Sequence, residues 1–246
     1  MGTAAALIVI VVLLLAGAFW WYHHSTTVRQ REFDDAKAEA RRWVERLGGQ
    51  VLNLVGSTEP AKQALADAAE RHNAAGSQLE QANTPEQCRL TTRTALEGLY
   101  YVRAARTAMD MDPGPELPDL DGQREAGTVT EYREVEVNGG KQMASPEPGE
   151  HTPHYYPGGR VAGRPVPRGW YSEPWWKPAL AAGAWGMGSF LLMGALFSGM
   201  SGVPAEAAAG QDPGGDAGGG ADDPGADGGG EFDGGFDMDG FDLGGF

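Results

Sequence analysis

ALIVIVVLLLAGAFWW, residues 6–21, is the stretch around which the rest of this sequence is organised. No charged side chain occurs from Met1 to Val28, and a second uncharged stretch runs from Pro178 to Ala205. All 19 lysines and arginines lie between the two stretches. A helix that crosses a bilayer needs roughly 20 apolar residues, and basic residues are retained on its cytoplasmic side. The pattern predicts a cell-membrane protein whose loop, residues 29–177, is cytoplasmic and whose termini are both extracytoplasmic.

The first apolar segment, residues 1–28, is predicted to be an uncleaved transmembrane anchor. A cleaved signal peptide is the alternative, because Ala16-Gly17-Ala18 resembles a cleavage triplet. Signal peptides carry a positive region ahead of the apolar run, whereas here the positive residues follow it. That order favours an anchor with its N-terminus outside. Trp20, Trp21 and Tyr22 are then expected at the membrane interface.

The second apolar segment, residues 178–203, is predicted to be a second transmembrane helix. Small residues four apart, Gly194, Ser198 and Gly202, match the pattern that lets membrane helices approach closely. A flexible glycine-rich run, or a hairpin lying on the bilayer surface, is the alternative. Amphipathic aromatic residues before the segment are expected at the membrane interface, namely Trp170, Tyr171, Trp175 and Trp176.

Residues 29–111 are predicted to form a three-helix, coiled-coil-like bundle. The helices are expected at about residues 32–47, ending at Gly48-Gly49; at about 60–82, capped by Ser57 or Thr58; and from Thr84 to about 111. Apolar residues spaced alternately three and four apart form the seams of the first two. They are Phe33, Ala36, Ala40, Trp43 and Leu47, then Ala61, Leu65, Ala68, His72, Ala75, Leu79 and Ala82. Alanine seams bury little area, so we expect modest stability and help from a partner copy.

The rest of the loop divides into a linker, residues 112–127, and a small β/aromatic juxtamembrane module, residues 128–177. Thr128 to Val137 reads as a strand, and Asn138-Gly139 is a strong tight-turn signal before a short return strand to Ala144. The aromatic stretch that follows is too rich in proline and glycine for helix, so the module is expected to be an irregular β-hairpin. The predicted fold class is therefore mainly α.

The tail, residues 204–246, holds 11 acidic residues and no basic ones, and it is predicted to be disordered because it cannot bury enough apolar surface. Four phenylalanines spaced four or five residues apart are expected to bind a partner or mediate self-association: Phe232, Phe236, Phe241 and Phe246. A solvating tail without a partner is the alternative. The tail does not keep the period of a calcium-binding repeat.

No group of residues in the sequence predicts catalysis or a cofactor. His151 and His154 lie three apart in EPGEHTPH, as in some zinc sites, but Pro153 separates them and no third ligand group accompanies them. The single cysteine, Cys88, has no histidine near it in sequence. No nucleophile-elbow, metalloprotease or phosphate-loop motif occurs. No basic patch predicts nucleic-acid binding. We therefore expect no enzyme, no metal and no cofactor.

Several segments together resemble a known group of proteins. WVERLGG, QALADAAERHNAAGSQLEQA, ALEGLYYVRAART, TPHYYPGGRVAGRPVPRGWYSEPWWKPAL and the terminal GGF tail are similar to uncharacterised actinobacterial membrane-associated proteins with a domain of unknown function. The resemblance extends from Arg41 to the end of the chain. It implies an order of parts, from anchor through helical domain and aromatic module to glycine-rich segment and tail, and it implies no activity.

These observations predict a membrane-anchored scaffold or adaptor of the cell envelope that acts through protein–protein interaction. Its expected partners are membrane lipid and either further copies of itself or another envelope protein. A pore or transporter accessory subunit built on the glycine-rich segment is the alternative. The third hypothesis, an enzyme, depends only on the EPGEHTPH cluster.

Overall fold

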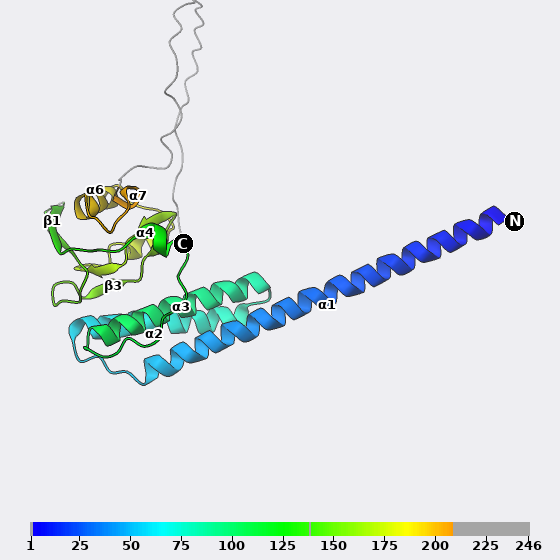
Figure 1. Ribbon diagram of the computed structural model, residues 1–246, viewed down its shortest axis with the longest axis horizontal. Helices are drawn as coiled ribbons and strands as arrows, with labels where there is room; N and C mark the ends of the chain where they lie inside the picture. The colour runs from blue at the N-terminus through cyan, green and yellow to red at the C-terminus, as the bar shows by residue number, and fades with distance from the viewer. Residues whose placement is uncertain (1, 138, 209–246) are drawn as a thin grey trace, which may run out of the picture. The chain divides into compact units, whose positions relative to one another are not determined.

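The computed structural model describes residues 2–137 and 139–208, in which a helical bundle is joined to a small antiparallel sheet (Figure 1). The helices are α1 (Gly2–Leu52), α2 (Glu59–Gln81), α3 (Pro85–Thr107), α4 (Gln123–Ala126), α5 (Lys177–Ala182), α6 (Met187–Phe197) and α7 (Ala205–Ala208). The strands are β1 (Arg133–Val137), β2 (Gly140–Ser145), β3 (His154–Tyr156), β4 (Gly159–Val161), β5 (Arg164–Val166) and β6 (Gly169–Tyr171). We call α2, α3 and the second half of α1 the bundle. We call the segment from α4 to α7, with the six strands between them, the sheet module. Both belong to one compact unit, Met1–Gln211.

The predicted membrane topology is wrong, because the helices of the structure do not meet its requirements. In the part of the chain that the structure describes, no helix combines the length and the apolar composition that crossing a membrane requires. This finding overturns the anchor at 1–28, the second span at 178–203, the placement of loop and termini on opposite sides of a membrane, and the fold class built on them. Before Val28, the only residues of α1 whose exposure the structure describes are Leu13 and Gly17.

The second apolar segment is not one helix because glycine interrupts it. Gly183 has a φ of 67° and ends α5, and α6 begins only after Gly186. A positive φ is a common end for a helix and is readily adopted by glycine. The buried side of α6 then packs on the sheet through Met193, Leu196 and Phe197. Its apolar composition therefore serves the interior of the protein.

Two helices of the bundle begin at threonine caps. The Thr58 hydroxyl accepts a hydrogen bond from the Ala61 amide at 3.2 Å, and the Thr84 hydroxyl accepts one from Gln87, also at 3.2 Å. Each cap satisfies an amide that has no partner within the helix. A proline follows in the first turn of both helices, where its missing N–H costs nothing.

Close packing between the helices depends on small residues. Ala40 and Leu47 of α1 are completely buried, as are the α2 alanines Ala68 and Ala75. The first helix continues through Gly48-Gly49 to Leu52, beyond the end that the glycines predicted. Gly48 lies against the His72 ring, and a Cβ there would come within 2.7 Å of Nε2.

The main sheet has the antiparallel strand order β1-β2-β6-β3. The predicted hairpin is β1 and β2, in which Val137 pairs with Gly140 and Arg133 with Ala144. β4 and β5 form a separate two-stranded ribbon. Its two-residue turn, Ala162-Gly163, has a positive φ at both positions, as type I′ hairpin turns do.

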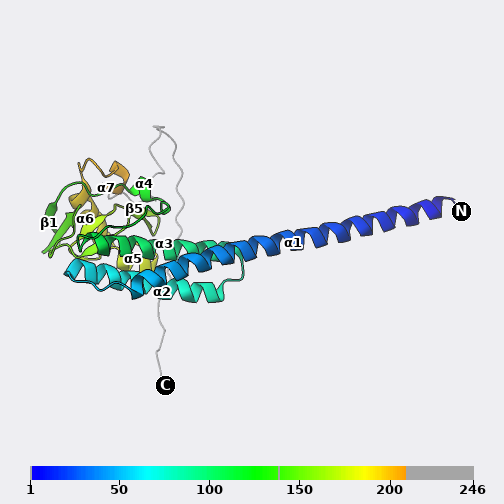
Figure 2. The same cartoon turned by 60° about the horizontal axis from the view of Figure 1, so that its bottom comes forward.

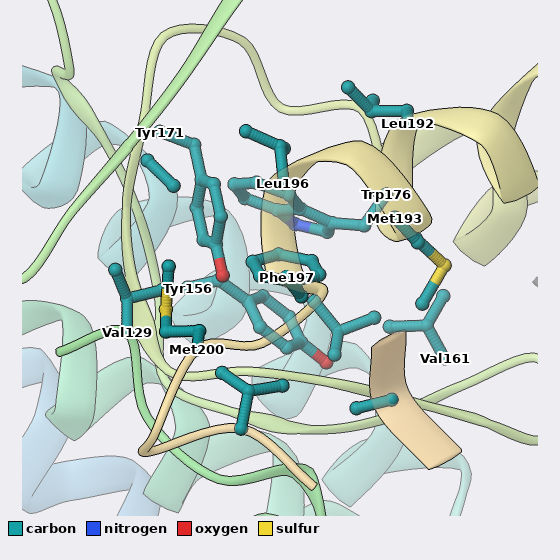
Figure 3. Close-up of a cluster of buried hydrophobic side chains, with 14 of the residues drawn as sticks. Val129, Tyr156, Val161, Tyr171, Trp176, Leu192, Met193, Leu196, Phe197 and Met200 are labelled. Atoms are coloured by element: carbon teal, nitrogen blue, oxygen red, sulfur yellow. The ribbon is translucent and has the colours of Figure 1, made fainter. Parts of the chain in front are cut away.

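The sheet lies between the bundle and α6, as both views of the ribbon show (Figures 1 and 2). Successive residues of a strand point to opposite faces, and β6 supplies both sides. Trp170 packs on alanines of α2 and α3, whereas Tyr171 packs against α6 and the Trp176 ring. The core on the α6 side is rich in aromatic rings (Figure 3). Trp176 is 5.1 Å from both Tyr156 and Tyr171, between ring centroids.

Candidate functional site

A cleft of about 250 Å³ opens where the sheet module meets α3. Its polar and aromatic lining comes from two parts of the chain: Tyr100, Arg103 and Thr107 from α3, and Tyr155, Arg168 and Trp170 from the module. We call it the junction cleft. None of its lining residues is an aspartate, glutamate, histidine or cysteine.

Regular structure positions the lining residues on both walls. Tyr100, Arg103 and Thr107 are spaced three and four apart, so they share one face of α3. The backbone of Arg168 is held on both sides, because its amide donates to the Gly127 carbonyl at 3.0 Å and its carbonyl accepts from Val129 at 2.8 Å. Gly127 has a φ of 75°. A side chain there would meet the Gly202 carbonyl, so this position favours glycine for two reasons.

The two arginines retain free hydrogen-bonding capacity. Arg103 donates to the Pro115 carbonyl, and Arg168 donates from Nη2 to the Thr128 hydroxyl at 3.3 Å. Each guanidinium has several further N–H groups. Neither forms an ion pair within the described residues, in contrast to Arg71 or Arg160.

Both guanidiniums act on the same two phenols. Burial raises the pKa of Tyr100, its hydrogen bond to Gln123 lowers that pKa, Asp119 raises it, and Arg168 and Arg103 lower it. Burial raises the pKa of Tyr155 to about 12, again against the opposing effect of Arg168 and Arg103. Both arginines line the same cleft, and each lies within electrostatic range of both phenols. The charged side chains of the lining itself are these two arginines, and the Asp119 carboxylate acts on Tyr100 from outside the lining.

One wall of the cleft is aromatic. The Tyr155 ring lies 5.0 Å from Trp170 and 6.0 Å from Tyr101, between centroids, and it meets Tyr101 edge-on. Trp170 is only 2% exposed and rests on alanines of α2 and α3. Within the described residues no hydrogen bond reaches the Tyr155 hydroxyl, and this oxygen is not among the fully enclosed unpartnered atoms.

Beside the cleft, the junction contains buried polar side chains. Lys177 Nζ lies 2.6 Å from Asp67 Oδ1 and 3.9 Å from Glu70. Arg71 lies 3.2 Å from Glu97. Asp67 Oδ2 and His154 Nδ1 are both buried without a hydrogen-bond partner in the described part of the chain. These charges connect α2 and α3 with one another and with the start of α5.

Burial also shifts the pKa of two side chains of this polar cluster, His154 and Glu97. It lowers the pKa of His154, and Lys177 lowers it further, while Asp67 and Glu173 oppose the shift. It raises the pKa of Glu97 against the attraction of Arg71. The ordinary histidine pKa already lies below pH 7, and burial lowers that of His154 further. The His154 imidazole is therefore uncharged near pH 7.

The structure disperses the residues that resembled a catalytic or metal site. His151 is exposed, whereas His154 is part of β3 and faces the polar cluster. Cys88 is completely buried in the bundle with Ala40 and Ala82. Over residues 2–137 and 139–208, no three His, Cys, Asp or Glu side chains gather as a metal site.

The residues predicted for a membrane interface or for membrane-helix packing have other surroundings. Trp170, Tyr171 and Trp176 are each at most 2% exposed and lie in the protein core. A Cβ at Gly202 would meet Thr130 and the Thr128 carbonyl, so this glycine permits a close approach of two chain segments. The Ser198 carbonyl accepts a hydrogen bond from Arg133 at 2.6 Å.

The other predicted packing and interface residues divide into two groups. Gly194 lies on α6, where the nearest atom to an added Cβ is the Ala208 carbonyl oxygen at 3.7 Å. Trp175 lies 5.7 Å from both Tyr171 and Trp176, between centroids. The remaining predicted site residues lie outside those whose side chains the structure describes: Trp20, Trp21 and Tyr22, then Phe232, Phe236, Phe241 and Phe246.

Comparisons of the chain with protein-family models, with curated proteins and with solved structures gave no match. The junction cleft was also not predicted from the sequence. Arg103 belongs to a helix that reads as a core element, and Arg168 belongs to a stretch dominated by aromatics, proline and glycine. The two arginines share one feature in the sequence, which is that no aspartate or glutamate lies within four residues of either along the chain. Arg160 and Arg164 share that signal, so it does not single out the cleft arginines.

Proposed function

We propose that this protein is a non-catalytic adaptor that holds a segment of a partner protein in the junction cleft. The observation that carries the proposal is an open cleft in which two arginines without acidic partners face an aromatic wall. Arginine, tyrosine and tryptophan are the residue types enriched where proteins bind one another. The exposed Thr107 side chain adds a hydroxyl that can make a polar contact and fix orientation.

The absence of catalysis is part of the proposal and is supported by the chemistry of the lining. General acid–base catalysis at neutral pH needs a group that titrates near pH 7, and nucleophilic catalysis needs a base beside the nucleophile. The lining supplies arginines and two tyrosines whose pKa values burial raises. The two phenols keep their protons throughout the physiological range.

Site-specific photo-crosslinking tests this function because it captures a partner of any sequence. A benzoylphenylalanine at position 107, in place of the exposed cleft residue Thr107, is expected to form adducts with another polypeptide in the protein's native cells. Mass spectrometry should locate these adducts in one recurrent segment of that polypeptide. The matched control places the same group at Asn73, an exposed α2 residue outside the cleft lining.

The two positions give opposite expectations. Adducts from position 107 that recur in one segment, with none from position 73, support the adaptor. Equal labelling from both positions, adducts scattered over many proteins, or no adduct from position 107 would contradict it.

A further inference from the structure

Resting on the proposed function, the geometry points to the feature that the junction cleft recognises: a carboxylate beside an aromatic side chain in an acidic polypeptide segment. Arg103 and Arg168 bind the carboxylate, and the neighbouring ring packs against Tyr155, Pro113 and Pro146. Such a segment contains aspartate or glutamate next to phenylalanine, tyrosine or tryptophan.

The anionic part of the ligand follows from the unbalanced charge. Two guanidiniums meet at the cleft, and no lining residue is acidic. Both have N–H groups left after one hydrogen bond each to the protein. Arginine binds carboxylates through parallel N–H···O contacts, and such charge-assisted hydrogen bonds are stronger than neutral ones. A partly enclosed site strengthens the attraction further, because less water screens it.

The aromatic part follows from the opposite wall. The accessible apolar part of this wall is the half-buried Tyr155 ring together with Pro113 and Pro146, and the buried Trp170 ring supports Tyr155 from behind. A bare anion would leave this surface wet, whereas a ring attached to the segment would bury it. Aromatic pairs contribute roughly 0.5–1.5 kcal/mol beyond the area they bury, so the wall selects among acidic segments.

The size and extent of the positive charge favour a peptide over a nucleic acid. A cleft of about 250 Å³ admits a group the size of one or two side chains. Nucleic-acid binding needs a basic stripe that follows many phosphates, and here the unpaired positive charge is confined to two arginines.

Peptide titrations test the inference directly. Fluorescence anisotropy of a labelled Gly-Gly-Phe-Asp-Gly-Gly peptide is expected to rise on addition of the protein. An asparagine in place of the aspartate should weaken binding about tenfold or more, and a glycine in place of the phenylalanine about three- to tenfold. The full chain and a variant ending at Gln211 are both titrated, since carboxylates after that residue would compete with the peptide.

Protein variants locate the binding in the cleft. Arg103→Gln and Arg168→Gln should each weaken binding of the aspartate peptide about tenfold. Arg89→Gln is the matched control, since Arg89 is an exposed α3 arginine outside the cleft and removes the same charge. It should leave affinity within about twofold. Circular dichroism melting of each variant separates a lost contact from a lost fold.

The outcomes separate this inference from the adaptor function. No binding of the aspartate peptide to either form of the protein, or equal effects of all three arginine variants, would overturn the inference. Displacement of the peptide by inorganic phosphate at a lower concentration than by acetate would mean that the cleft prefers phosphate groups, which also overturns it. Crosslinking from position 107 to a partner segment without acidic residues would retain the adaptor and reject its proposed specificity.

Discussion

The bundle and the sheet module reach a stable interior by different means. In the bundle, α2 and α3 each have 23 residues, local caps and interlocking small side chains. In the module, four of the six strands have three residues each, and the core is a cluster of aromatic rings. Helical hydrogen bonds form within one segment, whereas strands this short have few ladder bonds of their own. The secondary structure of the bundle is therefore stabilised mainly by hydrogen bonds within each helix. The short strands of the module depend instead on the packing of side chains that are far apart in the sequence.

The largest effect is expected from Trp176→Ala, which removes the ring that contacts Tyr156, Tyr171 and Trp175. Trp176 is 1% exposed, and such truncations cost roughly 3–5 kcal/mol. The module should lose its near-ultraviolet circular dichroism signal and its protected amides, while the bundle retains its helical signal. Urea unfolding followed by both signals measures the difference.

A matched substitution outside the core completes that test. Tyr132 belongs to the module but is 57% exposed, so Tyr132→Ala should change the free energy of unfolding by less than about 0.5 kcal/mol. Simultaneous loss of helical and aromatic signals in the Trp176 variant would show that the two regions fold as one, contrary to the comparison.

The next largest effect is expected where the regions are joined by charge. Lys177→Met leaves the buried carboxylate of Asp67, whose side chain is 6% exposed, without its partner. We expect a loss of about 2 kcal/mol, less than for a fully buried pair because Lys177 itself is 36% exposed. Adding Asp67→Asn should recover more than half of the loss in a double-mutant cycle.

Lys62→Met is the surface control for this pair. Lys62 lies 3.7 Å from Glu59, and both side chains are more than half exposed, so its effect should stay below about 0.5 kcal/mol. If both lysine variants lose the same stability, the Asp67 contact does not couple the regions.

Substitutions of two bundle glycines by alanine are expected to change the free energy of unfolding in opposite directions. A Cβ at Gly76 would meet no atom within 4 Å, so Gly76→Ala should raise the free energy of unfolding by about 0.5–1 kcal/mol. A Cβ at Gly98 would overlap a methyl group of Leu47, and Gly98→Ala should lower it by about 1–3 kcal/mol. Thermal unfolding of both variants measures these changes in stability. A higher stability of the Gly98→Ala variant would contradict the close packing of Gly98 against Leu47.

The smallest effect is expected from His154 and concerns pH. Because its pKa is lowered in the folded state, the unfolded chain binds the proton more readily. Stability should therefore be full above the ordinary histidine pKa of about 6.5 and should fall as the pH drops below it. The melting temperature of the wild-type protein should fall between pH 7.5 and pH 5.5, and it should fall less in the His154→Gln variant. An equal fall in both proteins would mean that other groups cause the pH dependence.

Sequence patterns predicted the bundle better than the module. Heptad spacing and the Thr-x-Pro or Thr-Pro starts located α2 and α3 to within a few residues, because these signals are local. The end of α1 was not predicted, since the contact between Gly48 and His72 depends on tertiary packing. Asn138-Gly139 predicted one hairpin, whereas β3 to β6 are too short to show an alternating pattern.

The second apolar segment misled the prediction because composition does not distinguish a lipid environment from a protein core. Leu192, Met193 and Phe197 read as a membrane helix, yet the sheet supplies their apolar surroundings. The junction cleft escaped prediction for a related reason. Arg103 and Arg168 are 65 residues apart, and only packing of the module on α3 brings them together.

Adjacent residues of β6 pack on opposite faces of the sheet, and this restricts which insertions and deletions the sequence can tolerate. A one-residue insertion or deletion before Trp170 would exchange the indole and the phenol of Tyr171 between faces, spoiling the cleft wall and the aromatic core together. Gly169 is equally constrained, since a Cβ there would lie 2.6 Å from Val129. Related chains should therefore preserve Gly-Trp-Tyr without gaps while the surrounding loops vary in length.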